Sequence, residues 1–481
     1  MQPYPFLIIP LALATFIAFP ALAGPPLELR STLADQQEVA VTIYNEDLAL
    51  VRDQRKVTLQ QGENQLALRE VSAGIRPETA LLRSLGDAGG VRVIEQNFDF
   101  DLLTPQKLLE KYIGRTVQVV RVHPQTGEDS FETAEVLAAS DGVVLKIGDR
   151  IETGVPGRLV YPDVPADLRD RPTLVLQLHS DKSGEQQLEL AYLTSGLSWR
   201  ADYVAQLSED DRKLDLSGWV TLTNLSGTSY RSARLQLVAG DVNQVRQAIP
   251  MARDFMMEKG MVAASAPMQE ESLFEYHLYT LGRPTTLREN QTKQVSLLSA
   301  AGVPVEREYL LQGGDYYYRG QYDNLGEKLK IGVFLELANR EDMGLGMPLP
   351  KGIVRVYKKD RQGNAQFIGE DSIDHTPKNE TVRLKLGDAF DVTANRKQTD
   401  FQKLGGSGRY DYVFESAYGI ELKNAKTEAV TVKVVEPMPG DWEILSESHP
   451  HQKETAGTAS WRIKVPAEGS ATLTYRVRVR Y

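Results

Sequence analysis

The chain has 481 residues, with 65 acidic and 55 basic side chains and a formal net charge of −10 at neutral pH. A chain of this length exceeds what one hydrophobic core normally holds, so we expect several domains. The acidic excess argues against nucleic acid and anionic lipid as partners, because both attract basic surfaces.

Residues 1–23 carry no charged side chain and end in Ala21-Leu22-Ala23, the small-x-small pattern after which signal peptidase cuts. We therefore expect a cleaved signal peptide and an exported protein of the cell envelope, either periplasmic or at the cell surface or secreted. No later stretch reaches the roughly 18 apolar residues of a membrane helix. No transmembrane segment is expected after cleavage.

The mature chain alternates apolar and polar residues with period two, and the alternating segments end at Gly, Asn or Asp. This period places successive side chains on opposite faces, as in half-buried antiparallel strands. The sequence predicts an all-β protein built from several antiparallel β-sandwich domains. Because it contains no cysteine, packing and hydrogen bonds must hold these domains without disulfides. The alternation is clear in Val39-Val41-Ile43, Leu188-Leu190-Tyr192, Trp199-Ala201-Tyr203-Ala205-Leu207 and Val382-Leu384-Leu386.

One short helix is predicted where the alternation first pauses. Thr104 can cap its amino end, Pro105 suits the first helical position and Gly114 can terminate it. Five compact strand-like runs follow between Thr116 and Tyr161, separated by tight turns. Such close spacing predicts a small β-barrel inserted between larger sandwiches.

Between Gln247 and Ser272 the alternation fails, and five of the nine methionines lie among Ala, Pro and Gly. We interpret this stretch as a flexible linker, although thioether sulfurs can also bind copper(I). The predicted organisation is a signal peptide at 1–23, an amino-terminal β-sandwich part at 24–103, the helix and small barrel at 104–165, a further β-sandwich part at 166–246, the Met-rich linker at 247–272 and one or more carboxy-terminal β-sandwich domains at 273–481.

The text between about Gly344 and Arg396, with "VRVY", "GED", "HTP" and "AFDV" at characteristic spacing, is similar to a bacterial family of unknown function. Members of that family are often labelled mucoidy inhibitor A. The segments "VTIYNEDLALVRDQRKVTL", "GLSWRADYVAQL" and the carboxy-terminal "DWEILSESHPHQ" also resemble it. The resemblance implies an envelope-associated β protein without an assigned reaction, and the label hints at an influence on exopolysaccharide. Many members carry a coiled coil in the first half, and this sequence has no sustained heptads.

The stretch "GEDSIDHTPKNE", residues 369–380, gathers four carboxylates around a histidine. One interpretation is a calcium or zinc site formed by Asp371, Asp374 and His375. The other is a strand that runs into a Pro-containing turn, with Asp374 accepting hydrogen bonds from the turn. We favour the turn, because neighbouring residues on a strand point to opposite faces.

A second histidine pair, His449 and His451, has the spacing at which two imidazoles on an extended chain lie on one side and could share a transition metal. Exposed hairpins often hold such residues without a ligand, and we favour that interpretation.

The segment "DYYYRGQYDN" is the preferred binding candidate. Tyrosine rings can stack on sugar C–H surfaces while Arg, Asp and Asn hydrogen-bond hydroxyls. On a strand some of these rings would instead be ordinary sheet residues. The candidate binding residues are Tyr316, Tyr317, Tyr318, Arg319 and Tyr322.

The sequence contains no H-E-x-x-H, no G-x-S-x-G and no phosphate-binding Gly-Lys loop. We therefore expect no catalytic residues and no cofactor. The first hypothesis is an exported non-catalytic β-sandwich protein of the cell envelope that binds another envelope component, either a protein or a polysaccharide. The alternatives are a polysaccharide hydrolase or lyase, with Asp371 and Asp374 as acid and base, and a metal-binding envelope protein. Nothing in the sequence indicates an oligomeric state.

Overall fold

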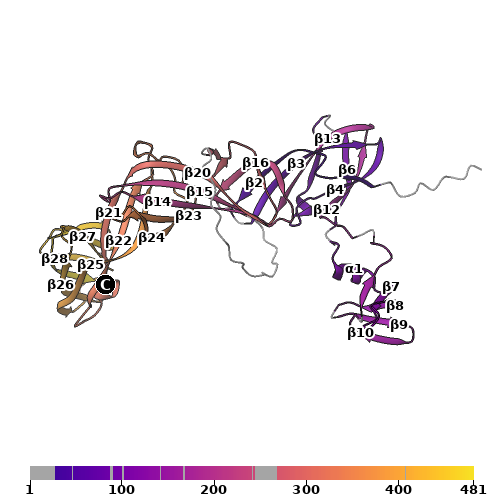
Figure 1. Cartoon of the computed structure of the whole chain (residues 1–481). Helices are drawn as coiled ribbons and strands as arrows, with labels where there is room; N and C mark the ends of the chain where they lie inside the picture. Colours follow the sequence, from indigo (N-terminus) through magenta and orange to yellow (C-terminus); the bar gives the residue numbers. More distant parts are fainter. Residues whose placement is uncertain are drawn as a thin grey trace, which may run out of the picture. The chain divides into compact units, whose positions relative to one another are not determined.

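The computed structural model describes residues 28–481 except 46, 87–89, 100–101, 141, 156, 166–167, 241, 244–267 and 407. The predicted signal peptide and most of the predicted Met-rich linker lie outside the described residues. The described part contains 31 strands, one α-helix and three short 3-10 turns (Figure 1). The all-β prediction is therefore confirmed. Of the helices in the described residues, none combines the length and apolar character needed to cross a lipid bilayer.

The chain divides into two compact units. The first contains residues up to 37, 53–71 and 77–191, and the second contains 38–52, 72–76 and 192–481. Three strands contribute residues to both units, namely β2 (Gln36–Tyr44), β3 (Leu48–Leu59) and β13 (Gly184–Thr194).

The first unit contains a four-stranded sheet and the strands β13 and β5, which extend the sheet that contains β3. The four-stranded sheet has the order β1-β4-β12-β6, and β3, β13 and β5 follow one another in a second sheet. The middle of β4 and the first half of β12 are buried on both faces, without alternation: Leu66, Ala67, Leu68, Leu174, Val175 and Leu176 are all buried. The additional elements are β1 (Glu28–Ser31), β4 (Gly62–Arg69), η1 (Pro77–Thr79), β5 (Leu81–Ser84), β6 (Val91–Asp99) and β12 (Thr173–Ser180).

The predicted short helix is present as α1 (Pro105–Lys111). Thr104 caps it, its Oγ1 accepting a hydrogen bond from Lys107 N at 3.1 Å. Leu109 and Tyr112 pack into a small core formed by the strands that follow.

The five strands after α1 form an open sheet with the order β10-β9-β8-β7-β11, so the predicted small barrel is wrong. In the described residues β10 and β11 are two edges that do not pair with each other. Closure would require β10 and β11, which have four and three residues, to pair with each other, and α1 packs against one face of the open sheet. The strands are β7 (Thr116–Val122), β8 (Asp129–Ala138), β9 (Val144–Ile147), β10 (Arg150–Thr153) and β11 (Arg158–Val160).

The second unit begins with two further sheet regions. One continues from β3 in the order β3-β2-β16-β18-β17, and β19 pairs with β16. The other is five-stranded, in the order β20-β15-β14-β23-β24, with β14 and β23 parallel. Residues 269–272 were predicted to lie in the linker, but they belong to β17. The strands are β14 (Leu197–Leu207), β15 (Lys213–Asn224), β16 (Tyr230–Ala239), β17 (Gln269–Leu273), β18 (Tyr276–Thr280), β19 (Thr285–Leu287), β20 (Gln291–Pro304), β23 (Gly352–Lys359) and β24 (Ala365–Ile373).

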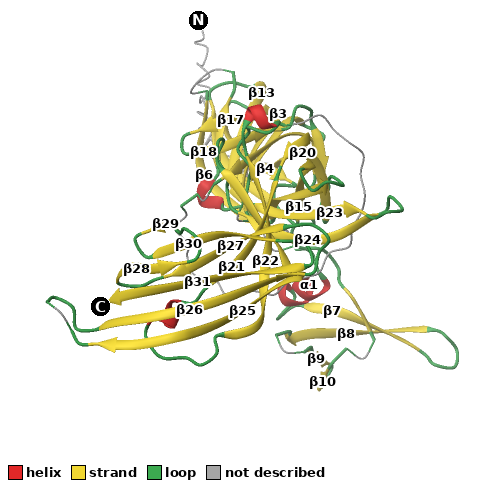
Figure 2. Ribbon diagram, turned by 90° about the vertical axis from the view of Figure 1, so that its left-hand side faces the viewer, coloured by secondary structure: helices red, strands yellow, loops and turns green. Residues whose placement is uncertain are grey.

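The carboxy-terminal part is a nine-stranded sheet with the order β28-β31-β26-β25-β22-β21-β27-β30-β29 (Figure 2). The two ends of this order share one hydrophobic core: Ile420 and Leu473 near one end pack in the same cluster as Val432 and Ile463 near the other. The sheet is therefore curled back on itself. Its elements are β21 (Glu306–Gln312), η2 (Asp315–Tyr318), β22 (Gly326–Ala338), η3 (Glu341–Met343), β25 (Thr381–Leu404), β26 (Val413–Asn424), β27 (Val430–Pro437), β28 (Asp441–Glu447), β29 (Gln452–Thr455), β30 (Thr458–Val465) and β31 (Gly469–Arg480).

The strand β25, with 24 residues, serves two cores. Its first part, including Val382 and Leu384, lines a small apolar cavity together with Tyr203 and Val354 of the five-stranded sheet. Its second part, beginning at Val392, contributes to the core of the curled sheet. A long strand that bends between two packed layers is a known way of forming a corner in β-sandwich proteins.

Two buried asparagines hold corresponding loops after β15 and β26. Asn224 Nδ2 donates to Thr228 O at 2.9 Å, and its Oδ1 accepts from Ser226 N. Asn424 repeats the pattern with Glu428 O at 2.8 Å and Lys426 N. Both side chains therefore satisfy backbone groups that the loops would otherwise leave unpaired.

Candidate functional site

The predicted binding segment lies in the second unit and forms a turn rather than a strand. The turn η2 follows Gly313, which lies against the carboxylate of Glu436. A Cβ atom at residue 313 would be 2.1 Å from Glu436 Oε2, so only glycine fits there without a shift. Backbone hydrogen bonds from Tyr317 N to Gly314 O and from Arg319 N to Tyr316 O close the turn.

A buried ion pair lies beneath this turn. Arg396 of β25 donates from Nη2 to Glu436 Oε1 of β27 at 2.6 Å, and the two side chains are 1% and 0% exposed. The hydroxyl of Tyr318 donates to Glu436 Oε2 at 2.9 Å, and Arg396 Nη1 donates to the hydroxyl of Tyr317 at 3.1 Å. The turn is thus attached to both members of the pair.

Burial shifts the pKa values of the carboxyl and hydroxyl groups in this network. It raises the pKa of Glu436, against the attraction of Arg396 and the hydrogen bond from Tyr318. It also raises the pKa of the Tyr318 and Tyr475 hydroxyls well above the ordinary tyrosine value. The two phenols therefore stay protonated and remain hydrogen-bond donors at neutral pH.

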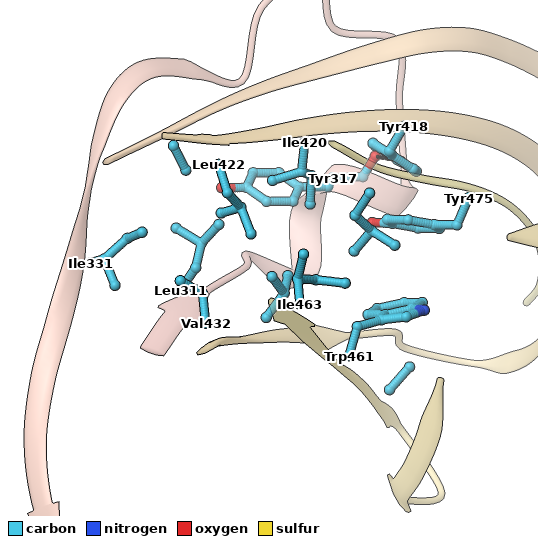
Figure 3. Close-up of a cluster of buried hydrophobic side chains, with 14 of the residues drawn as sticks. Leu311, Tyr317, Ile331, Tyr418, Ile420, Leu422, Val432, Trp461, Ile463 and Tyr475 are labelled. Atoms are coloured by element: carbon cyan, nitrogen blue, oxygen red, sulfur yellow. Dashed lines mark hydrogen bonds between the residues drawn. The ribbon is translucent and has the colours of Figure 1, made fainter. Parts of the chain in front are cut away.

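An aromatic ladder extends from the turn into the core, and Figure 3 shows part of it. The ring centroids of Tyr318 and Tyr418 are 5.3 Å apart, those of Tyr418 and Tyr475 are 5.1 Å apart, and those of Tyr475 and Trp461 are 4.8 Å apart. The Tyr418 hydroxyl donates to Tyr317 O at 2.7 Å. Tyr317 and Tyr318, two of the five predicted binding residues, are therefore buried anchors of the turn.

The other three predicted binding residues are at least partly accessible. Tyr316 is 51% exposed, and its ring lies 4.7 Å from that of Tyr317 and 5.7 Å from that of Tyr322. The N–H of Tyr322 donates to Gln398 Oε1 at 2.7 Å. The Arg319 guanidinium is 6.0 Å from the ring centroid of Tyr481.

Further rings continue this surface from Tyr481. The centroid of Phe414 lies 5.8 Å from Tyr481, 5.6 Å from Phe401 and 6.3 Å from Tyr412. Lys403 Nζ lies 5.2 Å from the Tyr412 centroid. We call this set the aromatic shelf, and it consists of Tyr316, Arg319, Tyr322, Phe401, Lys403, Tyr412, Phe414 and Tyr481.

A bulge in β25 places two of these side chains on the shelf. The pairing with β26 shifts by one residue between Gln398 and Asp400. After the shift Phe401 pairs with Ser416, and Lys403 pairs with Phe414. Paired residues of antiparallel strands lie on the same face, so these four side chains share the face of β26 that also carries Tyr418. Without the shift Phe401 and Lys403 would point to the opposite face.

The chemistry of the shelf suits binding. Exposed ring faces can contact C–H surfaces or other rings, and the Arg319 and Lys403 side chains add hydrogen-bond donors. Arg319 also lies 3.6 Å from the carboxylate of Asp315, which offsets its charge. Tyr412 is 51% exposed, so rings at two separate places on the shelf are open to a ligand.

The predicted metal residues of "GEDSIDHTPKNE" take part in protein contacts. Asp371 accepts backbone hydrogen bonds from Ser372 N at 2.8 Å and from Lys385 N at 2.7 Å, and so ties β24 to β25. His375 Nδ1 accepts from Lys351 N, and its Nε2 lies 3.3 Å from the Asn45 amide. At Asp374 the backbone carbonyl accepts from Thr376 Oγ1.

The second predicted metal pair lies in the loop that joins β28 to β29, the two edge strands of the nine-stranded sheet. His451 Nδ1 is 3.0 Å from Glu447 Oε2, and that carboxylate oxygen also accepts from Trp461 Nε1 at 2.9 Å. His449 Nδ1 is instead 2.9 Å from Ser448 Oγ. In the described part of the chain, no three His, Asp or Glu side chains are grouped so that they could hold a metal ion.

Sequence reasoning missed Arg396, Glu436 and the half of the shelf that β25, β26 and the last residue supply. A usable signal existed for the ion pair. Arg396 follows Val392 and Ala394 in phase on the buried face, and Glu436 follows Val432 and Val434 in the same way. Charged residues in phase with buried ones on two strands indicate a buried pair.

The ion pair provides the first prediction. Removing one charge leaves the other buried and unpaired, so Arg396→Met and Glu436→Gln should each lower the free energy of unfolding by about 3–5 kcal/mol. The double variant should lose less than the sum of the two. Urea unfolding followed by tryptophan fluorescence measures this, because Trp461 lies in the same core.

A half-exposed ion pair of the same sheet is the matched control. Arg476 donates to Asp400 at 2.7 Å, with side chains 32% and 36% exposed, and Arg476→Met should cost about 0–1 kcal/mol. If Arg396→Met costs no more than Arg476→Met, the ion pair does not hold the turn as described.

Together, the curled sheet and the shelf define an all-β protein whose carboxy-terminal region presents clustered aromatic rings to solvent. A family model described as "Domain of unknown function (DUF4139)" matches residues 188–481, which is more than half of the chain. The chain belongs to the DUF4139 family, and the matched region contains the ion pair and the whole shelf. A comparison with curated proteins found no match.

Proposed function

We propose that this protein is a non-catalytic binding protein exported to the cell envelope, and that it holds an envelope polysaccharide on the aromatic shelf. The observation that carries the proposal is the continuity of the shelf. Rings from β25, β26, the segment before β26 and the residue after β31 follow one another at centroid distances of 5.6 to 6.3 Å, beginning at Phe401 and ending at Tyr412 and Tyr481.

The chemistry of the shelf favours a sugar polymer over a protein partner. Protein interfaces are enriched in aromatic residues and Arg, but their buried centre is depleted of Lys and of other charged side chains. The shelf instead interleaves rings with the cations Arg319 and Lys403, and several of its rings are tyrosines that carry hydroxyls. This combination offers stacking to C–H faces and donors to hydroxyl or carboxylate groups along an extended chain.

Two arguments from the sequence support the location and role. The predicted signal peptide at residues 1–23 supports export. The likeness of residues 344–396 to proteins labelled mucoidy inhibitor A supports an association with exopolysaccharide, and we propose that the chain belongs with those proteins.

The shelf gives a direct binding test. Tyr316→Ala and Tyr412→Ala should each weaken polysaccharide binding by about 1–2 kcal/mol, roughly five- to thirtyfold, because each removes an exposed stacking face. Affinity electrophoresis in gels that contain neutral or uronic-acid polysaccharides measures the retardation of each variant. Phe131→Ala, which removes a ring that is 62% exposed in the first unit, is the control and should bind as the parent does.

The same experiment can reject the proposal. If no polysaccharide retards the parent protein, or if all three variants are retarded equally, the shelf is not a polysaccharide site. Recovery of a protein crosslinked to the shelf in intact cells, lost in Tyr316→Ala, would favour the protein alternative.

Export gives a second test. Cleavage after Ala23 should leave Gly24 as the first residue of the mature chain, and mass spectrometry of the amino-terminal peptide from fractionated cells measures this. Ala23→Arg should block cleavage and leave the longer chain, because signal peptidase requires a small residue at that position. Glu28→Gln, a change within the mature chain, is the control and should be processed as the parent is. A parent protein that keeps Met1 in the cytoplasmic fraction would contradict export.

A further inference from the structure

A second surface feature, separate from the shelf, is a wide bulge in β25. Lys330 and Gly332 of β22 pair with Thr393 and Asp388 of β25, so residues 389–392 of β25 lie opposite the single residue Ile331. The bulge falls where β25 passes from one core to the other. Phe390 is on this bulge, and its side chain is 95% exposed.

The bend of β25 between the two cores accounts for the bulge, but it does not account for an exposed phenylalanine at position 390. Backbone geometry alone turns the strand, and a polar residue at position 390 would serve equally well. A large apolar side chain left almost wholly in water is a sign of an interaction surface when other features point the same way.

The second feature is a groove beside the bulge, with a volume of about 290 Å³. Its apolar lining includes Leu207, Val333, Ile368 and Ala389. The exposed Phe390 also borders the groove. Gly369, next to Ile368 of the lining, allows β24 to lie close to β25, since a Cβ there would be 2.7 Å from Leu386 O. An apolar cavity of about 150 Å³ is enough to bind benzene, so the groove is large enough for a phenyl ring.

We infer that this face is a contact between two copies of the chain, in which Phe390 of each copy enters the groove of the other. A two-fold interface requires one patch to carry both a protruding group and its complementary hollow, because residue i contacts j and j contacts i. Phe390 and the groove meet this requirement within one patch.

The charges around the groove also suit a second copy. A two-fold interface brings a patch against itself, so a patch of one sign would repel itself. This patch carries both signs: Asp211 accepts hydrogen bonds from Arg307 and Lys358, and Lys330 lies 3.6 Å from Asp388. A partner with a strongly acidic or basic surface would find no net complement here.

Sedimentation equilibrium of the full mature chain over a range of concentrations tests the inference. The parent should show a monomer–dimer equilibrium, and Phe390→Asp should weaken it at least tenfold. Ile368→Trp, which fills the groove and leaves Phe390 in place, should do the same. Phe274→Asp, the same change at another phenylalanine that is 85% exposed, should leave the equilibrium unchanged.

The thermal midpoint of each variant, measured at a concentration at which the parent is monomeric, shows whether it is folded, and Phe390→Asp should not change it because the ring makes little contact within its own chain. A mixture of Phe390→Asp and Ile368→Trp should recover part of the dimer, since the intact phenylalanine of one meets the intact groove of the other. A parent that stays monomeric overturns the inference. So does a dimer that persists in Phe390→Asp and Ile368→Trp, or one that Phe274→Asp disrupts equally.

Discussion

The buried ion pair between Arg396 and Glu436 is the interaction on which the carboxy-terminal architecture depends. It joins β25 to β27, which are separated by β22 and β21 in the sheet order, and so links parts of the sheet that face each other after it curls. Isolated charges in such an environment would be strongly destabilising, and the tyrosine hydroxyls around the pair satisfy further oxygens and donors. The same hydroxyls fix the turn η2 on top of it.

The position of the shelf follows from this pair. With Tyr317 and Tyr318 held inward, Tyr316 and Arg319 are directed outward, and Tyr481 packs beside them through its contact with Arg319. The bulge at Gln398 then adds Phe401 to the same surface. Side chains from widely separated segments thus come together because one buried contact and one strand irregularity orient them.

The strands could be predicted from the sequence because period-two alternation reports directly which side chains are buried, and the cap and proline around Thr104 predicted α1. The open form of the sheet β7–β11 could not be predicted, since alternation within each strand does not show whether the two edge strands β10 and β11 pair with each other. In "DYYYRGQYDN" the residue types correctly indicated aromatic and charged side chains at a surface, but the segment forms a 3-10 turn and not a strand. The turn buries two consecutive tyrosines and exposes their neighbours. Phe401 and Phe414 are distant in sequence from that segment, so only the sheet register brings them to it.

Hydrogen exchange in Glu436→Gln tests most directly whether the buried pair orders the shelf. The amides of Tyr317, Arg319 and Tyr322, which donate to Gly314 O, Tyr316 O and Gln398 Oε1, should be protected in the parent protein. In Glu436→Gln the loss of global stability lowers protection throughout the sheet, and these turn amides should lose more protection than those of β26 and β31. Unchanged exchange in the turn, or a loss in the turn no larger than that in β26 and β31, would contradict the account.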